Sequence, residues 1–221
     1  MRSLVISPHP DDEVLGCGGT MLRRRNEGDQ IAWLIVTKMD HNSIWTDTQV
    51  AERDIQISKI KNFFGFEKVY QLDYPTSKLE QFPLQNIISD FSNVLNEFKP
   101  NEVFIPFEGD VHSDHRIVFQ AAMSSTKNFR APYIDRLLSY ETLSETDFNL
   151  SDESYFRPNY YVNIENQLQQ KIEAMEIYNS ELGKFPFPRS SEAIISLARY
   201  RGSTSGFVAA EAFRVLKEIQ K

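Results

Sequence analysis

Short apolar runs alternate with segments of helical periodicity over the first two-thirds of the chain. Strand-like runs cover residues 3–8, 31–37, 68–73 and 102–106. Helical patterns follow them from about residue 13, over 48–64, between Pro83 and Pro100, and from about 115 to 126. Strands that alternate with helices of this length indicate βαβ units, and hence a mostly parallel sheet with helices on both faces. Because the crossovers of such units are right-handed, we expect a doubly wound α/β fold.

The segment between Pro83 and Pro100 has the clearest helical pattern of the sequence. Proline is favoured at the first position of a helix and cannot continue one, so the two prolines set its limits. Its apolar residues fall on one stripe at helical spacing: Leu84, Ile87, Ile88, Phe91, Leu95 and Phe98. Gly28 and Gly65 stand where helix-ending glycines would follow the first two predicted helices.

The alternation weakens in the last third of the chain. Residues 136–143 and 160–164 are further strand candidates, and a helix over about 168–178 follows them. A loop over 183–191 leads to a short helix and a closing segment, 201–216, to which the pattern assigns no element. Because no linker is evident, we expect the 221 residues to form a single domain.

The bulk composition argues against several classes of protein. A net charge of −7 disfavours general nucleic-acid binding, which requires clustered lysine and arginine. The one basic cluster, Arg23–Arg25, is interpreted as the solvated face of a helix. No run of about 18 apolar residues occurs, so we expect no membrane-spanning helix. The single cysteine, Cys17, cannot form an internal disulfide, which is typical of a cytoplasmic protein.

Three of the four histidines stand beside acids in two short segments. The segments are PHPDDE at 8–13 and GDVHSDH at 109–115, and they follow the first and fourth predicted strands. In the common strand order 3-2-1-4 these two strands are neighbours, and ligands bind beyond their carboxyl ends. We therefore expect the two segments, about 100 residues apart in the sequence, to form one site. The fourth histidine, His41, is interpreted as an ordinary loop residue.

Imidazole and carboxylate groups in such clusters are typical ligands of a catalytic metal ion. Zinc takes three protein ligands and leaves a fourth position for water, which then loses a proton near pH 7. A carboxylate outside the ligand set can accept that proton, and a second histidine can stabilise an oxyanion or protonate a leaving amine. A divalent cation would also offset the repulsion between Asp11 and Asp12. Iron and manganese accept the same ligands, so the residue types leave the metal open.

Two other interpretations of the N-terminal segment are weaker. Acids at 11–13 could merely complement the dipole of a helix N-terminus, but this leaves the second His/Asp cluster unexplained. The glycines of GCGG, at 16–19, do not fit a dinucleotide-binding G-x-G-x-x-G loop, because an acidic trio separates them from the strand and would repel a pyrophosphate. We expect these glycines to allow close packing of the first helix against the sheet, and Cys17 to be a small buried residue.

PHPDDEVLGCGG near the N-terminus, HSDH after the fourth strand and RG…AEAF near the C-terminus resemble the PIG-L/LmbE-like family of zinc-dependent de-N-acetylases. The resemblance covers nearly the whole chain, and the combination of HPDDE with a downstream HxDH is its specific part. It implies a Rossmann-like fold that removes an N-acetyl group from a small-molecule amino sugar, typically an N-acetylglucosamine conjugate. Family members often associate, so a homo-oligomer is one expectation.

The resemblance also implies roles for individual residues. The implied zinc ligands are His9, Asp12 and His115. Asp11 would be the general base, and His112 would stabilise the oxyanion or protonate the leaving amine. Asp114 would support a histidine ligand from outside the ligand set. Asp110 stands where some sugar-thiol deacetylases carry an assisting tyrosine, Arg53 aligns only loosely with a sugar-contacting arginine, and the residues that contact the sugar stay unassigned.

Two other functions are compatible with the same residues. An amidase would cleave a larger acyl group from a thiol or amino-acid conjugate, and its released acid would not be acetate. A non-catalytic metal- or sugar-binding protein would have no evident need for the general base. The residues do not identify the aglycone or the pathway.

Overall fold

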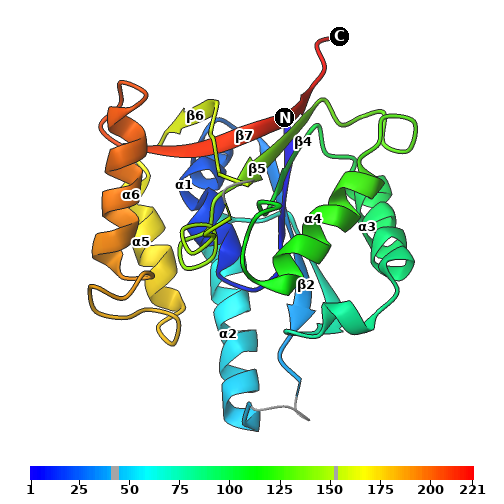
Figure 1. Ribbon diagram of the computed structural model, residues 1–221, viewed down its shortest axis with the longest axis horizontal. Coiled ribbons are helices and arrows are strands. Elements are labelled where there is room, and N and C mark those ends of the chain that lie inside the picture. The colour runs from blue at the N-terminus through cyan, green and yellow to red at the C-terminus, as the bar shows by residue number, and fades with distance from the viewer. Residues whose placement is uncertain (41–44, 152–153) are drawn as a thin grey trace.

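The computed structural model describes residues 1–40, 45–151 and 154–221, so His41, expected to be a loop residue, lies outside the described residues. Within these residues, seven strands form one sheet in the order β3-β2-β1-β4-β5-β7-β6 (Figure 1). The strands are β1 Arg2–Ser7, β2 Gln30–Lys38, β3 Lys68–Pro75, β4 Glu102–Ile105, β5 Arg136–Tyr140, β6 Tyr160–Asn163 and β7 Ala210–Glu218.

The first five strands are parallel, and β7 runs antiparallel to both of its neighbours. The predicted α/β fold with a mostly parallel, Rossmann-like sheet is therefore confirmed, including the order 3-2-1-4 of the first four strands. The closing segment, to which the sequence pattern assigned no element, forms β7 and inserts between β5 and β6. The single-domain organisation and the cytoplasmic location stay predictions.

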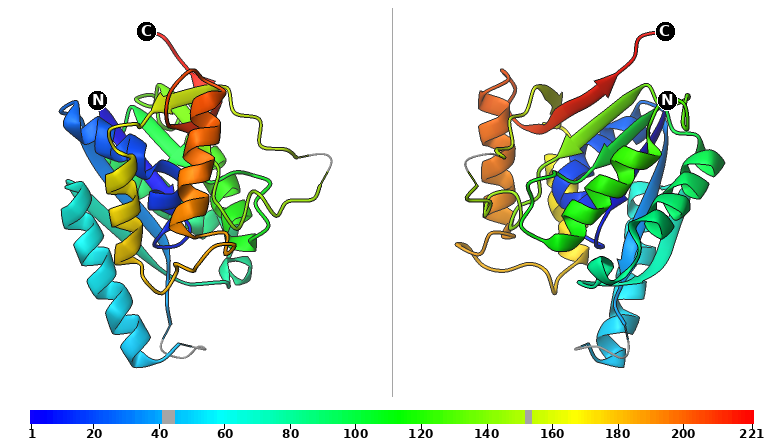
Figure 2. Two further views of the ribbon diagram at one scale, coloured as in Figure 1. Left: turned by 90° about the vertical axis from the view of Figure 1, so that its left-hand side faces the viewer. Right: turned by 45° about the vertical axis from the view of Figure 1, so that its right-hand side comes forward.

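Helices cover both faces of the sheet (Figure 2). On one face, α3 (Leu84–Phe98) and α4 (Ser113–Ser125) form an apolar core with the strands, close to the 3-10 turn Leu79–Gln81. The helices that pack on the other face are α1 Asp12–Asn26, α2 Asp47–Phe64, α5 Leu168–Ile177 and α6 Ser191–Ser203. No helix of the described residues combines the length and the apolar character needed to cross a bilayer.

The central strands are buried on both sides. In β1, Leu4 and Ile6 belong to the core under α3 and α4, whereas Val5 belongs to the opposite core. Because successive side chains of a strand point to opposite faces, a doubly covered strand is mostly apolar along its length. This explains why the candidates for β1, β2 and β4 were nearly continuous apolar runs rather than alternating patterns.

The helix ends agree with the sequence at α2 and depart from it at α4. Gly65 closes α2 in the left-handed conformation, with a φ of 68°, as predicted. α4 begins at Ser113, earlier than the predicted start near His115, and His112 is its N-cap residue. The ring Nδ1 of His112 accepts the backbone N–H of Asp114 at 3.1 Å. Caps are normally Ser, Thr, Asp or Asn, so the sequence pattern contained no signal for this start.

The interpretation of Arg23–Arg25 as a solvated face is wrong for its central residue. Arg24 is buried, and its Nε and Nη2 each lie 3.0 Å from an oxygen of the buried Glu102. Its position seven residues after Cys17 and three after Met21 places it on the buried stripe of α1, as helical spacing requires. The charge is paired rather than hydrated, which is how an arginine tolerates burial.

The last third of the chain holds α1 in place. Glu211, on β7, accepts the backbone N–H groups of Gly19 and Thr20 at 2.9 and 2.7 Å. Lys171, on α5, donates to Glu211 at 2.6 Å and to the carbonyl oxygen of Leu15 at 2.7 Å. The AEAF segment noted in the sequence therefore contributes a buried carboxylate to the first helix.

Two of the three glycines of α1, Gly16 and Gly19, have the packing role expected from the sequence. A Cβ added to Gly16 would lie 2.3 Å from the ring of Tyr140, and one added to Gly19 would lie 2.7 Å from Ile164. A Cβ at Gly18 would meet nothing closer than 3.4 Å. Cys17, between them, is fully buried, also as expected.

A Gly16→Ala protein is expected to lose about 1–3 kcal/mol of stability through overpacking. The ring of Tyr140 cannot move away easily, because it is fully buried and its hydroxyl donates to the carbonyl oxygen of Ile6 at 2.9 Å. Gly18→Ala is the matched control in the same helix: it should leave the stability unchanged or raise it by up to about 1 kcal/mol. Thermal unfolding of the two proteins tests this, with about 2–4 °C expected for each kcal/mol. Equal midpoints would contradict the packing role of Gly16.

Candidate metal centre and active-site cavity

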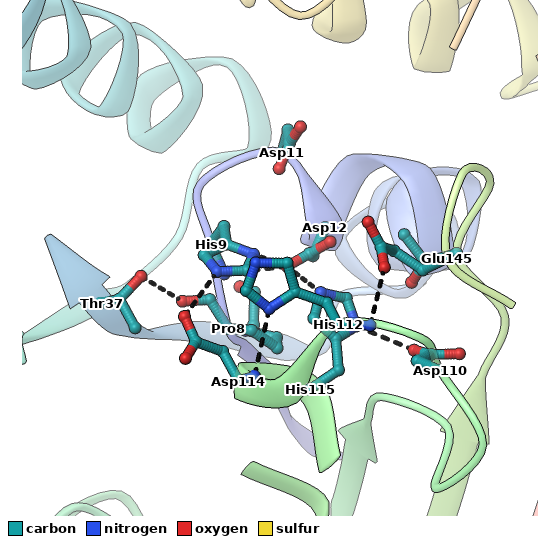
Figure 3. Close-up of polar contacts among 12 residues, drawn as sticks. Pro8, His9, Asp11, Asp12, Thr37, Asp110, His112, Asp114, His115 and Glu145 are labelled. Atoms are coloured by element: carbon teal, nitrogen blue, oxygen red, sulfur yellow. Dashed lines mark hydrogen bonds and ion pairs between the residues drawn. The ribbon is translucent and has the colours of Figure 1, made fainter. Parts of the chain in front are cut away.

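The two His/Asp segments meet beyond the carboxyl ends of β1 and β4, as the strand order predicts (Figure 3). β1 pairs directly with β4, and residues 8–11 continue from β1 into α1. Residues 112–115 form the start of α4 after the loop that follows β4. Adjacent parallel strands thus bring together side chains about 100 residues apart in the sequence.

Three side chains present ligand atoms to one another at distances that suit a metal ion. His9, Asp12 and His115 form a group that could hold a cation. His9 Nδ1 lies 3.4 Å and His115 Nε2 lies 3.3 Å from the same oxygen, Asp12 Oδ2. Tetrahedral ligands at zinc distances of about 2.0–2.1 Å are separated from each other by about 3.4 Å. The donor set and its spacing therefore fit a tetrahedral cation.

The outward nitrogen of each of these imidazoles is held by a second carboxylate. His9 Nε2 lies 3.0 Å from Asp114 Oδ2, and His115 Nδ1 lies 2.8 Å from Asp110 Oδ2. A carboxylate behind a histidine fixes the ring orientation and the tautomer, so that the other nitrogen is free to bind metal. Asp114 thus lies where its expected supporting role requires. Asp110, noted in the sequence only for standing in place of a tyrosine, has the same arrangement with His115.

A second group, His9, His112 and Asp114, also has the residue types of a cation site. It shares His9 with the first group, so both cannot use this residue through the same nitrogen. The carboxylate of Asp114 already accepts the backbone N–H groups of Ser77 and Leu79 at 2.7 and 3.2 Å. The first group is the better candidate because each of its imidazoles has a carboxylate on its other nitrogen, Asp114 for His9 and Asp110 for His115.

The protein groups of the candidate metal centre stabilise one another's charged forms. Burial alone would raise the pKa of Asp12, but His115 and His9 hold it well below its usual range. Burial opposes the protonation of His115, yet Asp12 and Asp110 raise its pKa well above the usual value. Burial also opposes protonation of His9, and Asp114 and Asp12 outweigh it, raising its pKa to about 9. Because these nitrogens bind a metal only when deprotonated, a divalent cation would take the place of the two protons.

Asp11 lies beside this group but does not belong to it. Its carboxylate is buried and lines a cavity, apart from the cluster around Asp12 (Figure 3). Its backbone has a φ of 133°, a conformation that costs a non-glycine residue about 1–3 kcal/mol and is concentrated at functional sites. Burial, followed by the charges of Asp12 and Glu181, raises the pKa of Asp11 to about 7.

The backbone around Asp11 is fixed by buried side chains. Glu13 accepts the N–H of Asp11 at 3.1 Å, and Tyr178 donates its hydroxyl to Glu13 at 2.8 Å. The guanidinium of Arg53 donates to the carbonyl oxygen of Pro10 at 2.8 Å. These contacts over-determine the strained conformation, as such a conformation requires.

His112 presents one nitrogen to the helix and the other to the cavity side. Because Nδ1 accepts the N–H of Asp114, the proton of the neutral ring is on Nε2, which lies 3.3 Å from Ser77 Oγ. Burial, then the charge of His9, lowers the pKa of His112 to about 4. Its backbone N–H donates to Glu145 at 3.1 Å. The ring is therefore arranged as a hydrogen-bond donor through Nε2.

A cavity of about 250 Å³ opens beside the cluster. His9, Asp11 and His112 line it on the side of the candidate metal centre. Its other lining residues come from the segment after β1, from the end of β2, from β3 and the residue that follows it, from α2 and the residues before it, and from the loops near residues 145, 181 and 189. They are Pro10, Thr37, Lys38, Met39, Trp45, Val50, Arg53, Asp54, Ile57, Gln71, Thr76, Glu145, Glu181 and Arg189. Arg53, which the sequence left unassigned, therefore belongs to the cavity wall.

A family model for PIG-L, the GlcNAc-PI de-N-acetylases, matches residues 4–126, more than half of the chain and both His/Asp segments. The chain belongs to the PIG-L family. The resemblance stated from the motifs is thereby confirmed, together with the LmbE-like deacetylase fold.

Similarity to individual proteins extends over the whole chain. The diacetylchitobiose deacetylase of Thermococcus kodakarensis is 23% identical over 99% of this chain and 84% of its own. The crystal structure of a conserved protein from Thermus thermophilus has 27% identity and a TM-score of 0.78, covering 99% of this chain and 96% of that one. The 4-carboxy-2-hydroxymuconate hydratase of Pseudomonas putida has a TM-score of 0.75 at 15% identity, covering 100% and 98%. This last likeness shows the fold alone, and one fold can carry different reactions.

Several cavity residues of this PIG-L protein were not found from the sequence. Glu145 lies in an irregular loop, Glu181 lies just before the segment 183–191 that was predicted only as a loop, and Arg189 lies within that segment. Loop residues have no periodic pattern, so only their charge distinguished them. Asp110 had one available signal: it lies five residues before His115, in the same acidic segment.

Proposed function

We propose that the chain is a zinc-dependent hydrolase that removes the N-acetyl group from an amino-sugar conjugate of the N-acetylglucosamine type. The observation that carries this proposal is the tetrahedral spacing of His9, Asp12 and His115, each histidine held from behind by a carboxylate. A buried carboxylate, Asp11, lines the cavity next to it. The family and the Thermococcus deacetylase support the same reaction class.

His9 Nδ1, Asp12 Oδ2 and His115 Nε2 would hold the ion. A bound zinc ion supplies Lewis acidity, which lowers the pKa of a coordinated water to about 7 and polarises the acetyl carbonyl. Asp110 and Asp114 keep the two imidazoles oriented with the correct nitrogens inward.

Asp11 accepts the proton that water loses as its oxygen attacks the acetyl carbon. The same carboxyl returns that proton to the nitrogen when the C–N bond breaks, so that the neutral amine and acetic acid are released, and the acid then loses its proton to solvent to give acetate. His112 donates a hydrogen bond from Nε2 to the oxygen on which negative charge develops. Its tautomer is set by the N–H of Asp114, so the donor is in place before the reaction begins.

Acetate release from N-acetylated sugars tests the proposal. Chelator-treated protein and the same protein after zinc is restored are compared on diacetylchitobiose and on the methyl glycoside of N-acetylglucosamine. We expect acetate only from the zinc-restored protein. A panel of larger N-acyl analogues accompanies it, because an amidase would release the larger acid instead. Protein that holds stoichiometric zinc and releases no acetate would contradict the proposal and favour a binding role or another reaction on this fold.

A further inference from the structure

We infer that the cavity favours uncharged amino-sugar conjugates over phosphate- or carboxylate-bearing ones, and that Glu181 determines this preference. The inference rests on the proposed function, because it concerns the aglycone of the same substrate. It starts from the two arginines of the cavity wall, Arg53 and Arg189, which are the groups that would ordinarily bind an anion.

Both arginines are already engaged by the same carboxylate. Arg53 Nη2 donates to Glu181 Oε1, and its Nη1 donates to the carbonyl oxygen of Pro10 at 2.8 Å. Arg189 Nη2 lies 3.3 Å from the other oxygen, Glu181 Oε2, and its Nε donates to the carbonyl oxygen of Glu181 at 3.2 Å. Arg53 is buried, with a side chain 7% exposed, so its guanidinium cannot turn outward to a ligand without breaking these bonds.

Away from the two histidines of the candidate site, Lys38 is the one further basic side chain of the described cavity wall. Asp54 and Glu145 add negative charge to the same wall. The third basic residue, Lys38, is partly exposed, and its Nζ lies 3.9 Å from Asp73 Oδ1. An anionic aglycone would therefore have to displace Glu181 from two arginines or lie close to several carboxylates.

Neutral sugar hydroxyls suit the same wall. They donate to the carboxylate oxygens of Glu181 and Glu145 and accept from the remaining N–H groups of Arg189, without removing any charge from its partner. Like charges brought within a few ångströms of each other are strongly unfavourable in a half-buried site, and such repulsion is a common source of specificity. The charges of the cavity wall thus disfavour an anionic aglycone, even where the aglycone is small enough to fit the cavity.

Two ligands that differ mainly in charge test this: the methyl glycoside of N-acetylglucosamine and N-acetylglucosamine 1-phosphate. Their affinities for zinc-loaded protein are measured by calorimetry, and kcat/KM by acetate release. Glu181→Gln keeps the shape and removes the charge, so the anion's affinity relative to the neutral ligand should rise by about tenfold. Arg189→Gln leaves the negative charge of Glu181 less neutralised, so the anion's affinity relative to the neutral ligand should fall by a similar factor. Glu176→Gln, an exposed carboxylate of α5 outside the cavity wall, should not change it.

Opposite shifts in the two cavity variants support charge selection, because a merely structural role would move both ratios the same way. Direct coordination of phosphate by the metal would strengthen binding of the anionic ligand in all variants alike. The deciding measurement is therefore the difference between variants in the affinity ratio of the anionic to the neutral ligand. Unchanged ratios, or shifts of the same sign, would overturn the inference. Since binding is measured apart from turnover, an absence of acetate would contradict the proposed function and still leave the charge selection tested.

Discussion

An Asp11→Asn protein is expected to bind zinc normally and to lose at least about 100-fold in kcat. The amide has the size of the carboxylate but cannot accept the proton of the attacking water. Asparagine tolerates positive φ values better than most residues, so the unusual backbone at position 11 should survive the change. The measurements are acetate release at saturating substrate and the zinc content of the purified protein.

The neighbouring acid supplies the matched control. Asp12 Oδ2 lies between the two candidate ligand nitrogens, so Asp12→Asn should lose metal as well as activity. The two variants remove one carboxylate each, one position apart, and their zinc contents should differ. If Asp11→Asn retained full turnover, or if it lost its zinc as Asp12→Asn does, the assignment of Asp11 as the base would be wrong.

His115→Ala is expected to lose bound zinc and all measurable zinc-dependent activity. His115 is buried and supplies Nε2 to the candidate site, and two ligands cannot hold the ion as three do. The change also leaves Asp110 without its imidazole partner, and an unpaired buried carboxylate destabilises the fold. His115→Gln, which keeps a polar group beside Asp110, is therefore measured in parallel, together with the circular dichroism spectrum of each protein.

An Asp110→Asn protein is expected to have a zinc affinity between those of the wild type and His115→Ala. The amide still accepts or donates one hydrogen bond to His115 but no longer stabilises its ring as a carboxylate does, and such changes typically weaken metal affinity by about 10–100-fold. Zinc titration should therefore rank the proteins as wild type, then Asp110→Asn, then His115→Ala. Stoichiometric zinc in a folded His115→Ala protein would contradict its role as a ligand.

The fold was predictable because its central strands are buried on both faces and its helices on one. A doubly covered strand such as β2 leaves a continuous apolar run, and α3 leaves a single apolar stripe between two prolines. The antiparallel β7 was not predicted, since nothing in a local pattern reports that the segment inserts between β5 and β6. The burial of Arg24 was missed because its partner, Glu102, lies 78 residues away.

The candidate site was predictable to the level of residues that cluster in the sequence. His9, Asp12 and His115 could be brought together because strand order decides which loops meet. The difference between Asp11 and Asp12 could not be read from spacing, since it depends on which way each side chain leaves the start of α1. Glu181 could not be found at all, because its place in the cavity depends on the course of an irregular loop.

Glu211 on β7 and Lys171 on α5 hold the backbone of α1 in place, so the two halves of the chain depend on each other. Every proposed ligand lies within the first 126 residues, the stretch that matches the family model. Yet Glu211 and Lys171, which bind the backbone of the helix that begins at Asp12, come from beyond it. A gene fragment that encoded only the first half would carry a complete donor set on a helix without its anchors. We therefore expect that the half with the donor set does not fold as a separate module.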